Sequence, residues 1–94
     1  MTSYGEGERV FGPPQGSYDA DWVVSAARSA DPGLPEETAR ELAVHAWEHL
    51  REMRELDAPE LARRLMAEHP SGATPANVVA KAAVDFCIAY GVDL

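Results

Sequence analysis

The chain has 94 residues, which is enough for one domain with a single modest core. Apolar residues make up 46 % of the sequence and charged residues 26 %, a composition that excludes an intrinsically disordered chain. The formal net charge of −8 argues against binding to nucleic acid or to an anionic membrane surface, because both need clustered basic side chains. The charge fits either a basic protein partner or simple solubility.

Residues 1–17 are rich in glycine and proline and show no helical periodicity, so we expect them to form an extended N-terminal arm. The remaining residues, 18–94, are predicted to form a single helical domain. Phe11 is one of the few large apolar side chains in the arm. It is a candidate either for a hydrophobic tether onto the domain or for a contact with another protein.

The first predicted helix is short and covers about residues 19–28. Either Ser17 or Asp19 is suited to cap it, because a side-chain oxygen at that position accepts hydrogen bonds from first-turn amides. Residues spaced by about one helical turn predict its buried stripe. These residues are Tyr18, Trp22, Ala26 and Ala30.

The second predicted helix is the longest, from Pro35 to about Leu56. Proline favours the first helical position, where its missing amide hydrogen costs nothing. Apolar residues recur at helical spacing along one face. Trp47 lies toward the edge of that face, and since tryptophan is enriched at interface hot spots, it is a candidate contact residue.

Two further helices are predicted in the C-terminal half. Asp57 and Glu60 have the spacing of a capping box, which starts a helix that ends near Glu68. The last helix is predicted to begin with Thr74 as its cap and to end at Tyr90, before Gly91. The fold class is therefore an all-α domain of four helices, one short and three longer.

The last predicted helix is apolar nearly all round, which is typical of a buried helix. Val84 and Ile88 lie one turn apart on its second apolar face. So small a domain covers both faces only if the short helix or the arm reaches the second one. We expect Val84 and Ile88 to belong to a protein interface, since an exposed apolar face in a soluble protein marks one.

The stretch from His45 to His49 has the spacing H-x-x-E-H, with Glu48 as its glutamate. It resembles the zinc motif of inverzincin metallopeptidases, which implies two histidine ligands and a glutamate acting as general base. Catalytic zinc needs a third protein ligand. His69 and Cys87 are candidates, but no sequence feature brings either to the motif. We therefore expect zinc to bind weakly, if at all, and the histidines to pair with neighbouring carboxylates.

The chain is thus predicted to be a non-catalytic, cofactor-free protein that acts by binding another protein, either a different protein or a second copy of itself. Such a protein would be a regulator, an antitoxin-like inhibitor or an accessory subunit. One alternative is a helix-turn-helix DNA-binding regulator, although its recognition helix would offer only Asn77 and Lys81 as polar or basic groups. The other alternative is a metal-dependent enzyme that uses the H-x-x-E-H segment.

The sequence predicts a cytoplasmic location. Cys87 is the one cysteine, so an intrachain disulfide is impossible and a reducing compartment is favoured. The first residues lack the apolar core of a signal peptide. The longest apolar stretch, residues 78–90, is shorter than the ~20 residues that span a bilayer. Abundant alanine, with arginine preferred over lysine, suggests a high-GC bacterial source.

Overall fold

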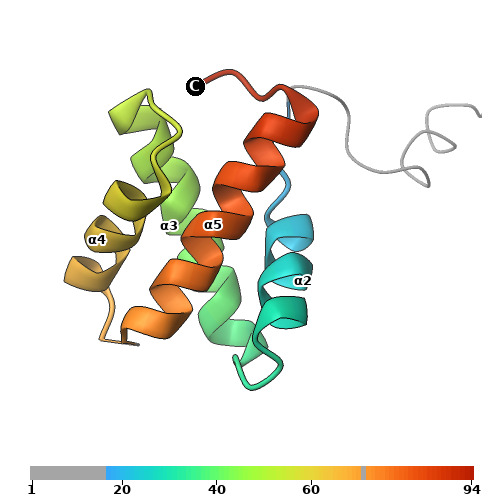
Figure 1. Ribbon diagram of the computed structural model, residues 1–94, viewed down its shortest axis with the longest axis vertical. Coiled ribbons are helices and arrows are strands. Elements are labelled where there is room, and N and C mark those ends of the chain that lie inside the picture. Colours follow the sequence, from blue (N-terminus) through green and yellow to red (C-terminus); the bar gives the residue numbers. More distant parts are fainter. Residues whose placement is uncertain (1–16, 71) are drawn as a thin grey trace, which may run out of the picture.

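The computed structural model describes residues 17–70 and 72–94, and this part of the chain forms four helices without any strand (Figure 1). Their bounds are Ala20–Ala30 for α2, Glu36–Met53 for α3, Ala58–Glu68 for α4 and Ala73–Tyr90 for α5. The prediction of an all-α domain with four helices is confirmed. The predicted arm lies outside the described residues except for Ser17, and Phe11 lies outside them too.

Two predicted N-caps are confirmed. The carboxylate of Asp19 accepts from the amides of Asp21 and Trp22 at the start of α2. At the start of α4, Asp57 accepts from the amide of Glu60 at 3.2 Å. The second half of the predicted capping box differs, because the Glu60 carboxylate accepts hydrogen bonds from the guanidinium groups of Arg63 and Arg64.

The start of α5 was predicted wrongly. Gly72, and not Thr74, is the residue before the helix, and it makes no capping hydrogen bond with a side chain. Pro75 lies in the first turn, where proline is tolerated at more than one position because these amides have no intrahelical partner. At the other end Gly91 adopts the left-handed conformation, with φ of 61°, and is the C-cap as predicted.

Helix α5 is the centre of the domain and packs against the three other helices. Figure 1 shows α5 in front of α3, with α4 and α2 on either side. Phe86 of α5 is fully buried and contacts the aromatic rings of Tyr18, Trp22 and Tyr90. This aromatic cluster joins α5 to α2 and to the residues just before it. A nearly apolar helix is therefore buried on several sides, in agreement with its sequence.

The buried stripe of α2 differs from the predicted one. Val23, Val24 and Ala27 are buried, whereas Trp22 is only partly buried and Ala30 is exposed. The helix packs against both α3 and α5, so the face between the two neighbours is the most deeply covered. In the part of the chain that the structure describes, no helix is both long enough and apolar enough to cross a membrane.

Candidate functional site

Three of the residues predicted to contact a partner, Val84, Ile88 and Trp47, lie in the part of the chain that the structure describes, and they differ in exposure. Val84 is 7 % exposed and belongs to the core cluster, so the predicted second apolar face of α5 is partly covered. Ile88, one turn later, is 65 % exposed. The two residues therefore lie in different environments. Residues one turn apart on a central helix lie at different distances from the ends of the neighbouring helices, so one can be covered while the next is exposed.

Trp47 is partly buried, and its indole ring stacks on Tyr18 with the ring centroids 4.8 Å apart. The Tyr18 hydroxyl donates to the backbone carbonyl of Ala43 at 2.7 Å, which ties the residues before α2 to α3. The guanidinium of Arg51 lies 5.7 Å from the centre of the Trp47 ring, within cation–π distance. Trp47 thus stabilises the packing of α2 on α3, with one edge left accessible.

All three histidines of the chain lie together at the boundary between α3 and α4. Nδ1 of His45 is 2.5 Å from Nε2 of His69, and the two imidazole centroids are 4.6 Å apart. Nε2 of His49 lies 3.0 Å from the Glu68 carboxylate, which is also 3.7 Å from Nδ1 of His45. His69 was a candidate third ligand, but no feature of the sequence predicted its approach to the H-x-x-E-H segment, and Glu68 was not among the candidates.

The hairpin formed by α3 and α4 explains the cluster. The chain reverses between Met53 and Ala58, so the C-terminal end of α4 returns alongside the middle of α3. Glu68 is the last residue of α4 and His69 is its C-cap. A short antiparallel connection therefore brings residues about twenty positions apart into contact. The sequence feature that could have indicated this contact is the short turn between the two helices, because a short turn limits how far α4 can diverge from α3.

Charge within the cluster favours the ionised carboxylate. The hydrogen bond from His49 is the main cause that lowers the pKa of Glu68, and the electrostatic attraction of the three imidazoles acts in the same direction. Nδ1 of His49 is buried and makes no hydrogen bond with the described residues. The His49 side chain is 16 % exposed and is thus more enclosed than those of His45 and Glu68.

A second feature is an acidic stripe on the exposed side of α3, which consists of Glu37, Glu41, Glu48 and Glu52. At about 100° per residue these four positions fall within a narrow sector of the helix. Val44 lies in the same sector and is 44 % exposed. An aliphatic side chain is therefore presented to solvent between carboxylates.

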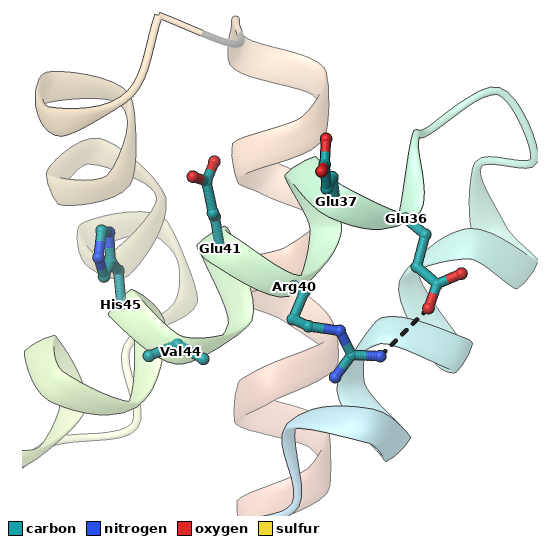
Figure 2. A pocket seen from close by; sticks show the side chains of 6 residues that line it. All are labelled: Glu36, Glu37, Arg40, Glu41, Val44 and His45. Carbon is teal, nitrogen blue, oxygen red and sulfur yellow. Dashed lines mark hydrogen bonds and ion pairs between the residues drawn. The ribbon is translucent and has the colours of Figure 1, made fainter.

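The N-terminal half of the stripe borders an open groove of about 500 Å³. Figure 2 shows six of the residues that line it, which are Glu36, Glu37, Arg40, Glu41, Val44 and His45. Arg40 turns away from the two neighbouring carboxylates and pairs with Glu36 at 3.2 Å and with Asp21 at 2.5 Å. Among the described residues, Glu37 and Glu41 have no basic partner within ion-pair distance. The groove thus combines free negative charge with one apolar contact.

The histidine cluster meets this groove at His45, which lines it. Glu48, the glutamate of the H-x-x-E-H segment, belongs to the acidic stripe. His49 hydrogen-bonds to Glu68, whereas the side chains that approach one another closely enough for a metal are His45, Glu68 and His69. The arrangement that the inverzincin resemblance implies, with both histidines of the segment as ligands, differs from the one observed.

Helix α5 has few of the features of a DNA-recognition helix. Asn77 hydrogen-bonds to the backbone carbonyl of Ala73, and Lys81 pairs with Asp85 at 2.9 Å. Eight of the helix's 18 residues are buried, and Asn77, Lys81 and Asp85 lie at exposed positions. A helix that enters the major groove must be exposed along one side and carry free polar or basic groups. Residues 69–72 connect α4 to α5.

Comparison of the chain with protein-family models, with curated proteins and with solved structures found no match.

Proposed function

We propose that this protein is a non-catalytic, acidic binding protein, whose partner offers a basic segment with an aliphatic side chain to the exposed face of α3. The observation that carries the proposal is the acidic stripe with Val44 at its centre. Charge complementarity steers association and selects partners, while a buried aliphatic contact adds to affinity. The net charge of −8 adds a long-range field of the same sign.

The proposal of a basic partner is supported by the lack of ion pairs at two carboxylates of the acidic stripe, as far as the described residues show. Glu41 and Glu48 flank Val44 and, within the described part of the chain, neither is in an ion pair with a basic side chain. Their binding to a cationic partner would therefore break no existing pair. The same charge opposes DNA binding. The pairing of Lys81, the one basic residue of α5, with Asp85 is a second argument against a helix-turn-helix regulator.

The test compares two double variants with equal net charge. Glu41→Lys with Glu48→Lys reverses the stripe, and Glu55→Lys with Asp93→Lys reverses two exposed acids outside it. Each double variant changes the net charge by +4, from −8 to −4. A random peptide library displayed on phage is selected against the immobilised wild-type protein, and the enriched peptides are measured on all three proteins.

We expect enriched peptides to be rich in Lys and Arg with an aliphatic residue, and to bind the wild type and the control variant but not the stripe variant. Their binding should weaken as salt rises through the physiological range, because exposed charge pairs are screened. Val44→Ser should weaken binding without changing the salt dependence. Peptides without basic residues, or peptides that bind equally well to the stripe variant, would refute the proposal.

A further inference from the structure

We propose that His45, Glu68 and His69 form a binding site for one divalent cation of the zinc class. One potential ligand atom from each of these side chains lies within 4.8 Å of the other two. Two imidazoles and one carboxylate are a ligand set that zinc uses in proteins, with a water molecule in the fourth position. The site is independent of the partner-binding proposal, except that His45 also lines the groove.

The observed distances are near those that a bound ion needs. Ligand atoms of a tetrahedral zinc site are about 3.4 Å apart when the metal–ligand bonds are about 2.1 Å. The separation of 3.7 Å between His45 and Glu68 already fits. The separation of 2.5 Å between His45 and His69 must increase by somewhat less than 1 Å. A hydrogen bond between the two ring nitrogens needs one of them to carry the proton, whereas both would have to offer a lone pair to an ion.

The required movement is small and unobstructed. The side chains of His45 and Glu68 are partly exposed, so their rotation displaces solvent and not core atoms. His69 follows the last turn of α4 and has an extended backbone, with φ of −121° and ψ of 128°. The two imidazoles come from different elements, since His45 lies within α3 and His69 is the C-cap of α4. Exposure also leaves the fourth coordination position open to water.

His49 is a positioning residue for the site. Its Nε2 lies 3.0 Å from the Glu68 carboxylate and holds that group beside His45. Metal-binding carboxylates are commonly oriented by such a hydrogen bond, and loss of the outer partner weakens metal affinity by about 10–100-fold.

The test is a calorimetric titration of the full chain with Zn²⁺, carried out in parallel with thermal melts. We expect one Zn²⁺ per chain and a melting temperature that rises with metal concentration, because a ligand bound only by the folded state stabilises it. His69→Ala removes a ligand without touching the groove, and Glu68→Gln removes the carboxylate. Each should weaken the affinity for Zn²⁺ by more than about 100-fold, while His49→Gln should weaken it by about 10-fold.

Glu55→Gln is the matched control for the carboxylate, since Glu55 is exposed in the connection between α3 and α4 and lies outside the three-ligand set. It should leave the affinity within about 2-fold of the wild type, a change smaller than the loss of an outer-shell partner causes. A wild-type affinity unchanged by both His69→Ala and Glu68→Gln, or no saturable binding at all, would overturn the proposal.

Substitution with Co²⁺ gives a measurement that depends on no variant. Co²⁺ that is bound by two imidazoles and a carboxylate in four-coordinate geometry should give visible absorption bands far stronger than those of aqueous Co²⁺. A spectrum identical to that of the aqueous ion would refute the site even if Zn²⁺ binds elsewhere. Failure of the partner-binding test would leave both metal measurements unaffected. Peptide binding is tested with variants at Glu41 and Glu48, and neither residue is one of the three proposed ligands.

Discussion

Cys87 is the only thiol of the chain and lies buried in α5. Desolvation raises its pKa to about 11. The thiolate is the reactive form, so at neutral pH both burial and protonation protect the sulfur from oxidants and alkylating reagents. The buried position also separates Cys87 from the histidine cluster, which excludes it from the three-ligand set.

We expect Cys87 in the folded protein to react with iodoacetamide at pH 8 far more slowly than in the urea-denatured chain. The measurement is the labelled fraction by mass spectrometry as a function of time. Labelling at equal rates in the two states would show that the thiol is accessible in the folded protein and that α5 opens locally at its C-terminal end.

Glu60 makes ion pairs with two arginines of its own helix, Arg63 and Arg64. Hydrogen bonds from Arg63 and then Arg64 lower its pKa from 4.5 to about 2. A carboxyl whose pKa is lower in the folded state stabilises the fold at pH values above the unfolded pKa. That stabilisation is lost as the pH falls from about 4.5 to about 2.

We therefore expect Glu60→Gln to be less stable than the wild type at pH 7, with a difference that shrinks steadily between pH 4.5 and pH 2. Urea unfolding midpoints at several pH values measure this difference. Because Glu60 and its arginine partners are partly exposed, the difference should also fall as salt is added. Glu55→Gln is the control, since Glu55 is exposed in the connection between α3 and α4, and it should leave the unfolding midpoint at pH 7 close to that of the wild type.

At the scale of the elements, the two longest helices end in the same way but with different residues. Gly91 ends α5 and Arg54 ends α3, and both adopt the left-handed conformation, with φ of 61° and 55°. In each case the amide of the cap residue donates to a carbonyl in the last turn. Glycine takes this conformation without steric cost, whereas an L-residue with a Cβ atom is disfavoured by roughly 1–2 kcal/mol.

Opposite substitutions at these two positions should have opposite effects. We expect Arg54→Gly to increase the free energy of unfolding by about 0.5–1 kcal/mol and Gly91→Ala to decrease it by about 1 kcal/mol. Chemical denaturation of both variants in one buffer provides the measurement. A loss of stability in Arg54→Gly would mean that the arginine side chain makes a contribution larger than the strain at its backbone.

For the whole molecule, the most consequential arrangement is the central position of α5 among three other helices. It buries Val84 but leaves Ile88 largely exposed, although the two residues have equivalent positions in the apolar pattern. A charge introduced at a buried position without a partner costs several kcal/mol, which is a large part of the stability of a small domain.

We expect Val84→Glu to unfold the domain or lower its stability by several kcal/mol, and Ile88→Glu to change it by less than about 0.5 kcal/mol. Circular dichroism with thermal melts distinguishes the two. Sedimentation of the Ile88→Glu variant tests self-association in addition: a wild-type dimer that becomes a folded monomer would identify Ile88 as part of its interface. A destabilised Ile88→Glu monomer would show that this residue is covered in solution.

Much of the secondary structure could be predicted because its signals are local. Asp19, Asp57 and Gly91 perform the capping roles that their side chains or backbone freedom favour, and these depend only on nearby residues. The start of α5 was predicted less well, since Thr74 and Pro75 are both compatible with any position in a first turn. The burial of Val23 in preference to Trp22 needed knowledge of the neighbouring helices.

The sequence by itself determined that this chain forms amphipathic helices around an apolar fourth one, because helical period and caps are set by the spacing of residues along the chain. It also determined an acidic protein with three histidines. Only the tertiary structure decided that His69 and Glu68 meet His45, and that Val84 is covered while Ile88 is not. These outcomes depend on how far one helix extends alongside another and on how the helix axes are placed. Neither quantity is encoded in a local sequence pattern.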